Sequence, residues 1–599
     1  MKLILHFFFF FLFFCSFSNE NKLIAGLGGL GRETWGAGGI EHDIEVNPIE
    51  DIEEQAIDSE SENIKKKKGI KSIELKNIDP NTIGVLSNKE GLGYEMWKGS
   101  ERKFVEKYLA LLPINKESNV AIDLTKKLLL TSANTPSGEG ENNLFIIRIK
   151  KLLELGDLEN TKLLIDSLSD YEKNEEIQKI EIEINLSFNN FDLVCSSIDE
   201  KIKKYKSDIY WKKIQIFCQI LNDEIHKANL GLSLIKEHEN FNDDIFLNIV
   251  DSLIYKEEID ISQYADIDLL NLTMTRIGKI ILPDDLSFPN DPLFLSMLYR
   301  MPNVPIETRI RALEQSQKLI SIPEDIIQEM YNSYEIKENE TKFSLDSDFP
   351  DLGPATQAIL YQRAIKEDSN ENKAIIIKQA FNLAQENKNY SLIVKLNLET
   401  LLEIKASKKL LWFANTASKA LFYSNELEMA FDWYKLLINN RNDNINIFID
   451  LMEIWPIAEI FKLYEKDYQN KKELNISQEE IIESISKFQL QGETLSFDTI
   501  GLYFLETFGI KINPSIWLAT LEENQDNSLI MPNSSIISLI DFATKNNRVG
   551  EAVLLILIAA DGNELIKFNP FFLQKIITSL DRLGLGEKVK DLIIETLIS

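Results

Sequence analysis

Apolar residues recur at helical spacing over most of the chain beyond residue 100. Phe104, Tyr108, Leu111 and Leu112 lie on one face of the first predicted helix, and Pro113 ends it. The chain contains only 25 Gly and 16 Pro among 599 residues and is rich in Leu, Ile, Lys, Glu and Asn, which argues against an all-β fold. We therefore predict an all-α protein.

Pairs of short amphipathic helices follow residue 144. Their tight turns are expected at 156–157, 189–190 and 222–223, so that successive turns are 33 residues apart. A glycine or asparagine ends the first helix of such a pair in the left-handed conformation, and Asp or Asn begins the second. A period near 34 is typical of tetratricopeptide repeats, whose helix pairs stack into a solenoid.

The pattern returns later, with turns near Asn387, Asn425, Asn547 and Gly586. The pair around Asn425 resembles a tetratricopeptide repeat most closely. The small, large, small and aromatic positions of that repeat are matched in order by Ser418, Leu421, Ala430 and Tyr434. The pair departs from the repeat at Ala414, where an aromatic residue is usual, and no proline closes it. The resemblance implies an α-solenoid and leaves the activity open.

Five blocks along the chain read GYEMWKGSERKFVEKYLALLP, KLLLTSANTPSG, MLYRMPNVPIETRIRALEQ, AILYQRAI and WFANTASKALFYSNELEMAFDWY. In this order they resemble successive parts of an uncharacterised family of exported alphaproteobacterial proteins. The resemblance extends over most of the chain after its first residues. It implies export and helical repeats, and it implies no activity, cofactor or catalytic residue.

The amino-terminal segment has the layout of a secretory signal peptide. Lys2 precedes an apolar run at Phe7–Phe14, and Ser16 and Ser18 occupy the small positions before a cleavage site at Asn19. The run is too short for a comfortable transmembrane span, and no other stretch approaches 18 uninterrupted apolar residues. We expect residues 1–18 to be removed, the protein to be exported, most simply to the periplasm, and the mature chain to have no transmembrane span.

The three cysteines leave alternatives open. Cys15 would permit a lipid anchor, but it follows Phe13 and Phe14 instead of the small residues usual before a lipidated cysteine. Cys195 and Cys218 could form a disulfide in an oxidising compartment. We favour the interpretation that both are small buried apolar residues, because sequence does not supply the geometry that a disulfide requires.

Charge is unevenly distributed. The chain has 65 basic and 95 acidic residues, a formal net charge of −30, which argues against a nucleic-acid partner. Residues 19–63 hold 12 acidic and 2 basic residues, so a third of the excess lies there. Such blocks are usually solvated, and we predict a disordered, glycine-rich and acidic tail over 19–78. Docking of a basic partner or of a divalent cation by this tail is the alternative.

Proline marks a break in the helical pattern, because it removes a helix donor and clashes with the preceding turn. Eight of the 16 prolines fall within 283–354, where short helices such as 305–319 can still form. The predicted plan is a signal peptide (1–18), a tail (19–78), a lead-in segment with first helices (79–143), N-terminal helical repeats (144–282), a proline-rich joint (283–354), central tetratricopeptide-like repeats (355–440) and C-terminal helical repeats (441–599).

Catalytic motifs are missing from the sequence. There is no HExxH, no paired CxxC, no Walker loop and no GxSxG, so we assign no catalytic residue, metal or cofactor. Four aromatic residues could line a binding groove, although such residues more often pack helices together: Trp412, Trp433, Tyr434 and Trp455. Long concave faces of helical solenoids commonly bind peptides.

The sequence thus favours a non-enzymatic, exported helical-repeat scaffold that binds protein or peptide partners in the cell envelope. The first alternative is a carboxylate-dependent enzyme on a helical toroid, acting on cell wall or polysaccharide. A lipoprotein anchored through Cys15 is the second alternative.

Overall fold

The computed structural model describes residues 79–598, apart from 115–117, 170–172, 238–241, 262–266, 283–290, 318–321, 338–339, 341–354, 494, 496, 498 and 521–528. In these residues the regular elements are α-helices, short 3-10 helices and three isolated β-bridges, without a strand. The predicted all-α class is confirmed. The predictions for Cys15, Ser18, Asn19 and the acidic tail lie outside the described residues.

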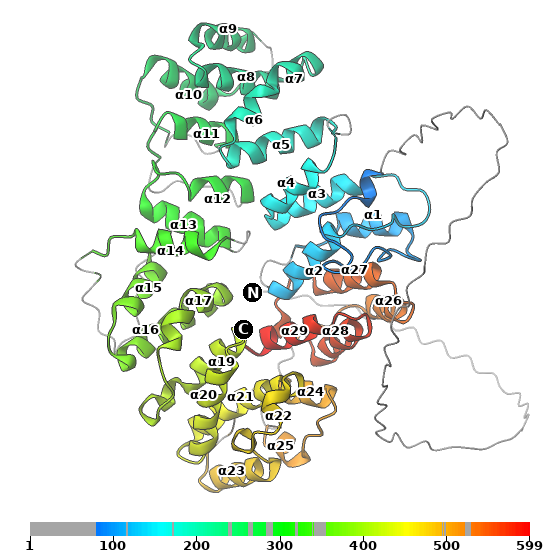
Figure 1. Ribbon diagram of the computed structural model, residues 1–599, viewed down its shortest axis with the longest axis vertical. Coiled ribbons are helices and arrows are strands. Elements are labelled where there is room, and N and C mark those ends of the chain that lie inside the picture. The colour runs from blue at the N-terminus through cyan, green and yellow to red at the C-terminus, as the bar shows by residue number, and fades with distance from the viewer. Residues whose placement is uncertain are drawn as a thin grey trace, which may run out of the picture. The chain divides into compact units, whose positions relative to one another are not determined.

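The helices fall into three groups along the chain (Figure 1). The first group comprises α1 Arg102–Ala110, α2 Asn119–Leu130, α3 Leu144–Leu155, α4 Leu158–Asp166, α5 Glu175–Ser187, α6 Phe191–Ser196, α7 Ile198–Lys204, α8 Ile209–Leu221, α9 Ile225–Lys236, α10 Asp244–Tyr255 and α11 Leu269–Ile277. The next group comprises α12 Pro292–Leu298, α13 Ile306–Gln317, α14 Glu324–Asn332, α15 Thr356–Lys366, α16 Asn370–Glu386, α17 Tyr390–Leu396, α18 Leu398–Leu402, η3 Lys408–Phe413, α19 Ala414–Tyr423 and α20 Leu427–Asn440. The last group comprises α21 Ile445–Tyr464, α22 Lys466–Gln469, α23 Gln478–Leu490, α24 Ile500–Thr507, α25 Pro514–Leu518, α26 Ser534–Lys545, α27 Val549–Ala560, α28 Pro570–Arg582 and α29 Gly586–Ile598.

Left-handed residues make the tight turns between paired helices, at or beside the predicted positions. Gly156 has φ 83°, Asn189 59°, Asp223 61°, Asn425 59° and Asn547 53°. Glycine, asparagine and aspartate tolerate this conformation best, which is why the turns could be found in the sequence. The helices on either side of each turn pack against each other, as in α3–α4, α8–α9, α19–α20 and α26–α27.

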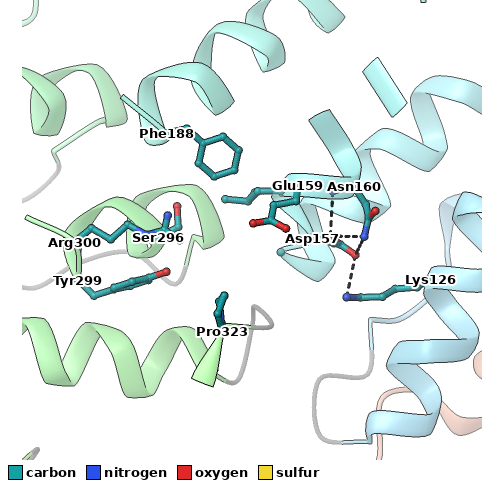
Figure 2. Close-up of a pocket in the computed structure, with 11 residues that line it drawn as sticks. Lys126, Asp157, Glu159, Asn160, Phe188, Ser296, Tyr299, Arg300 and Pro323 are labelled. Atoms are coloured by element: carbon teal, nitrogen blue, oxygen red, sulfur yellow. Dashed lines mark hydrogen bonds and ion pairs between the residues drawn. The ribbon is translucent and has the colours of Figure 1, made fainter. Parts of the chain in front are cut away.

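The turn at Gly156 shows how such a pair is fixed (Figure 2). Asp157 begins α4, and its carboxylate accepts a hydrogen bond from the backbone amide of Asn160 at 3.3 Å. The same carboxylate lies 2.9 Å from the ammonium group of Lys126 on α2. One aspartate therefore caps its own helix and ties that helix to an earlier one.

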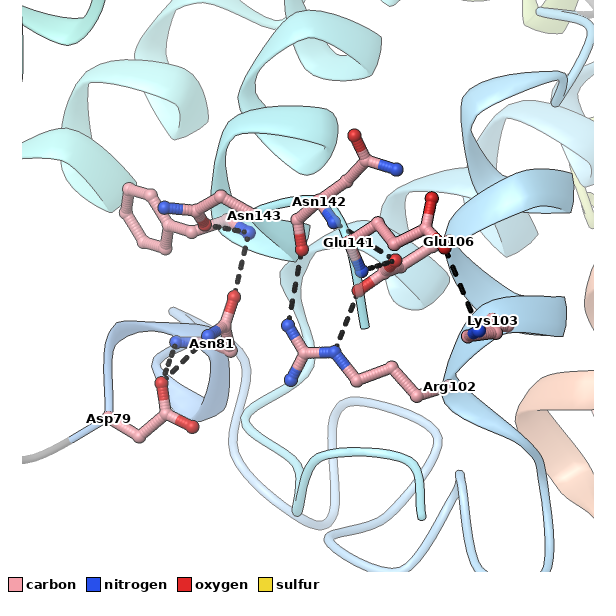
Figure 3. Close-up of polar contacts among 9 residues, drawn as sticks. Asp79, Asn81, Arg102, Lys103, Glu106, Glu141, Asn142 and Asn143 are labelled. Carbon is pink, nitrogen blue, oxygen red and sulfur yellow. Dashed lines mark hydrogen bonds and ion pairs between the residues drawn. The ribbon is translucent and has the colours of Figure 1, made fainter. Parts of the chain in front are cut away.

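The lead-in segment is held by buried charges. Glu106 on α1 pairs with Arg102 at 2.7 Å and accepts the backbone amides of Glu141 and Asn142 at 2.9 and 3.1 Å (Figure 3). Burial acts to raise the pKa of Glu106, but Arg102 and the two amides lower it overall. A Cβ at Gly140 would lie 1.9 Å from the Glu106 carboxylate, so glycine lets the loop approach.

Arg148 on α3 fastens the lead-in segment to the end of α2. Its guanidinium donates to the carbonyl of Leu129 at 2.5 Å and to that of Ile83 at 2.6 Å. Burial lowers the pKa of Arg148 to about 10. Carbonyls at the end of a helix carry partial negative charge, which favours a cation at this place.

Short helices fill the described part of the proline-rich joint. The helix expected at 305–319 is present as α13, and α12 begins with Pro292, whose missing amide is not needed in a first turn. α12 also packs against α3 and α5. The joint is therefore in contact with helices more than a hundred residues earlier in the chain.

Contacts also join the beginning of the described chain to its end. α2 packs against α27 and α29 (Figure 1). The carboxylate of Glu595 on α29 accepts the amides of Asn119 and Val120, each at 3.0 Å, at the first turn of α2. Burial raises the pKa of Glu595 to about 7, although these donors favour its charged form.

A second contact of this kind lies at the start of α27. The amide of Gly550 donates to the carbonyl of Met96 at 2.9 Å, and the Ser100 hydroxyl donates to the buried Glu551 carboxylate at 2.8 Å. A Cβ at Gly550 would lie 2.9 Å from the Trp97 ring. The lead-in segment thus packs on both its neighbouring helices and a helix about 450 residues later, which the sequence did not indicate.

Cys195 and Cys218 form a disulfide between α6 and α8, with their Cα atoms 5.5 Å apart. The favoured interpretation of two buried apolar residues is wrong, because Cys218 is buried but Cys195 is partly exposed and bonded to it. The pair lies on adjacent helix pairs at a distance suited to a disulfide. This geometry could not be read from a sequence separation of 23.

The apolar centre of the later half is α21, the longest of the helices given above. It packs against α19, α20, α24 and α29. Even so, none of the helices in the described ranges has both the length and the apolar content that crossing a membrane requires.

Candidate ligand-binding site

A cavity of about 470 Å³ opens among α16, α19 and α21. We call it the Trp412 cavity, after the one predicted aromatic residue that lines it. Its wall also includes the end of η3 and the first residue of α17, and its residues are Lys378, Phe381, Asn382, Gln385, Tyr390, Trp412, Asn415, Thr416, Lys419, Asn444, Asn446, Ile447 and Asp450. All of them come from one continuous stretch of the chain.

Trp412 reaches solvent because the 3-10 helix η3 directs neighbouring aromatic residues to different sides. Phe413 is fully buried and meets the Trp433 ring edge to face, with 5.8 Å between ring centroids. Trp412 keeps 39% of its surface exposed. The ammonium group of Lys378 lies 5.5 Å from the centre of the Trp412 ring, within the range of a cation–π contact. The indole is therefore anchored on one side and open on the other.

Asn415 and Lys419 on α19 bind the acids of α21, Asn415 through hydrogen bonds and Lys419 through an ion pair. The amide nitrogen of Asn415 lies 2.8 Å from both the Asp450 and the Glu453 carboxylates. Lys419 pairs with Glu453, also at 2.8 Å. Burial acts to raise the pKa of Glu453, but Lys419 and Asn415 lower it overall, whereas burial raises the pKa of Asp450. The cavity consequently has polar walls with little excess charge.

Several polar groups at the rim remain available to a ligand. Asn382 and Asn446 are exposed, and the Asn444 side chain uses its oxygen to cap Ile447 at 3.1 Å, while its amino group has no hydrogen-bond partner among the described residues. Among the described residues Lys378 has no ion-pair partner. Amide side chains both donate and accept hydrogen bonds, which matches the alternating donors and acceptors of an extended peptide backbone.

The other predicted aromatic residues do not reach this cavity. Trp433 and Tyr434 are fully buried and Trp455 is 2% exposed. They pack in the core formed by α19, α20 and α21, as helix-packing aromatics do. The prediction that they could contact a partner is wrong for these three, because an amphipathic pattern does not separate the buried aromatic of a pair from the exposed one.

The described residues form no group of side chains that would support metal-dependent or histidine-dependent chemistry. No group of three or more His, Cys, Asp and Glu among these residues has the geometry to hold a metal ion. His226 is exposed on α9. Two acids have strongly shifted pKa values: Glu595, which caps α2, and Glu183 on α5, whose pKa is raised to about 7 by burial and by Asp291 and Asp268.

Comparison with known proteins finds no matching protein-family model, no matching curated protein and no matching solved structure.

Proposed function

We propose that this protein is an exported, non-enzymatic scaffold of tetratricopeptide-like helix pairs and that it binds an extended segment of a protein partner in the Trp412 cavity. The observation that carries the proposal is the exposed indole of Trp412 beside the exposed amide side chains of Asn382 and Asn446, in a cavity where η3 packs against α16 and α19 packs against α21. Solenoids of helix pairs bind peptides on such faces.

Spacing supports the repeat arrangement. The left-handed turn residues Gly156, Asn189 and Asp223 are 33 and 34 residues apart. Each joins two helices that pack on each other. Stacking such units would give a continuous core and one long face, which is the architecture that the proposal requires.

Export is supported by the disulfide as well as by the signal-like first residues. Cys195 and Cys218 lie at bonding distance, and disulfides persist mainly in oxidising compartments such as the periplasm. Cleavage before Asn19 is the expected processing. Mass spectrometry of the protein purified from its native envelope would separate an amino terminus at Asn19 from a lipidated Cys15, and an unprocessed Met1 would contradict export by this route.

A display library of random peptides selected on the full-length protein tests the binding function. We expect selected peptides to bind at micromolar concentration or better, and the W412A and N382A variants to weaken this binding at least tenfold. The matched control is F571A, since Phe571 is 66% exposed on α28, outside the cavity. Selection of no peptide, or equal binding to the wild-type and W412A proteins, would contradict the proposal.

A further inference from the structure

A second cavity lies where the beginning of α4 faces the end of α12 (Figure 2). We call it the Arg300 cavity. Its volume is about 240 Å³, or roughly the share of eight water molecules in the liquid. Buried Leu158 and Tyr299 form its apolar lining, and half-buried Phe188 adds to it. The cavity therefore has the size of a small organic molecule and an apolar floor.

Two opposite charges face this cavity without meeting. Glu159 extends from the first turn of α4, and Arg300 follows the end of α12 (Figure 2). Within the described part of the chain neither has an ion-pair partner, and their charged atoms are farther apart than the 4.0 Å of an ion pair. The neighbouring charges do pair, since Lys126 lies 2.9 Å from Asp157.

The unpaired arginine is the more informative of the two. Acidic residues outnumber basic ones by 95 to 65, so most basic side chains can find a carboxylate. The Arg300 guanidinium instead lies over the Tyr299 ring, 4.9 Å from its centre. The side chain of nearby Arg276 donates to the amide oxygen of Asn189 at 2.6 Å, and burial and the charge of Arg300 lower its pKa. The wall formed by Arg300 is thus positive, and no described residue supplies it with a counter-ion.

Both charges act on the same buried phenol. Burial raises the pKa of Tyr299, the charge of Arg300 and a hydrogen bond from Arg300 oppose this shift, and the charge of Glu159 adds to it. The charges of both side chains therefore act at Tyr299. A ligand that carries both charges could satisfy the two walls at once, whereas an ion of one sign would leave the other charge facing it.

We propose that the Arg300 cavity binds a small zwitterion with an apolar body, of the size of a single apolar α-amino acid. Glu159 accepts hydrogen bonds from its ammonium group, and Arg300 donates to its carboxylate. The apolar side chain lies against Leu158 and Phe188. This site is separate from the Trp412 cavity and does not depend on the function proposed for it.

Calorimetric titration of the full-length protein tests the assignment. L-Leucine is the probe for a free amino acid, and L-leucyl-L-leucine is the probe for the two ends of a short peptide. N-acetyl-L-leucine carries the carboxylate alone, and L-leucinamide carries the ammonium group alone. We expect at least one zwitterion to bind, L-leucine above all, and both single-charge compounds to bind at least tenfold more weakly.

The variants E159Q and R300Q test the roles proposed for the two charged side chains in binding the ligand. Each should weaken L-leucine binding at least tenfold, and E159Q should also abolish the preference for L-leucine over N-acetyl-L-leucine. D192N is the control, because Asp192 is an exposed acid on α6 away from the cavity. Equal melting temperatures would show that all three variants fold. No binding of either zwitterion at millimolar concentration, equal binding of N-acetyl-L-leucine, or unchanged binding by E159Q would overturn the proposal.

Discussion

The Trp412 cavity and the Arg300 cavity are built in different ways. The first is lined by side chains from one stretch, between Lys378 and Asp450. The second collects side chains from α2, α4, α12 and the start of α14, spread between Lys126 and Pro323. Repetition of a helix pair is enough to make the first, whereas the second requires the chain to fold back on itself. Local periodicity therefore accounts for one kind of site and long-range packing for the other.

The largest expected effect is a difference in unfolding free energy between variants of two tryptophans near the Trp412 cavity, one buried and one exposed. W433A should cost about 3–5 kcal/mol of unfolding free energy, because it empties a fully buried site. W412A should cost less, about 1–2 kcal/mol, because Trp412 is 39% exposed and less apolar surface loses its contacts. Urea denaturation measures both. Equal losses would mean that Trp412 is a packing residue and not a surface available to a ligand.

The long-range contact at Glu595 should respond to pH. The pKa of Glu595 is raised from 4.5 to about 7 in the folded chain, so the folded state holds its proton more tightly. This stabilisation is complete below pH 4.5 and is lost as the pH rises through 7, by up to about 1.4 kcal/mol per pH unit.

Thermal unfolding from pH 4.5 to pH 8 should therefore show a fall in stability in the wild-type protein that is smaller in E595Q. Glu183, whose pKa is also raised to about 7, remains in both proteins, so only the difference between the two profiles reports on Glu595. Superimposable profiles would contradict the assignment.

A smaller loss is expected from G550A. The added methyl group would lie 2.9 Å from the Trp97 ring and 3.0 Å from the Met96 carbonyl, and the lead-in segment would have to move. We expect a net loss of about 1–2 kcal/mol, because crowding exceeds the gain in helix propensity. G586A is the control, since its nearest neighbour would be 3.6 Å away, and it should cost nothing. Chemical denaturation of both variants would show whether the contact between lead-in segment and α27 is as close as the structure indicates.

The smallest effect concerns the wall of the Trp412 cavity. N415A removes the donor shared by Asp450 and Glu453 and should cost about 1 kcal/mol. N382A removes an exposed amide without such contacts and should leave stability unchanged within about 0.5 kcal/mol. A loss on N382A as large as that on N415A would show that the rim amides serve the fold instead of a ligand.

The sequence was sufficient to predict the class of fold and the positions of the tight turns. Helical spacing predicts the helices, and Asn425 or Gly156 marks a turn because few other residues accept a left-handed backbone. It was not sufficient for the disulfide, nor for the burial of Trp433 and Tyr434, because both depend on how helix pairs are rotated against each other. The Arg300 cavity was missed for a stronger reason: Glu159 and Arg300 are brought to one cavity only by tertiary packing.

The bond between Glu595 and Val120 spans 475 residues, and this sets an order of events during synthesis. At about 5–20 residues per second, the carboxylate is made roughly half a minute to a minute and a half after the amide that it accepts. Within the finished structure Ser118 supplies the other side-chain cap of α2, through the amide of Ala121 at 3.1 Å. The full set of contacts at the first turn of α2 therefore requires the last helix of the chain, so a truncation that removes α29 would leave these amides without the Glu595 carboxylate.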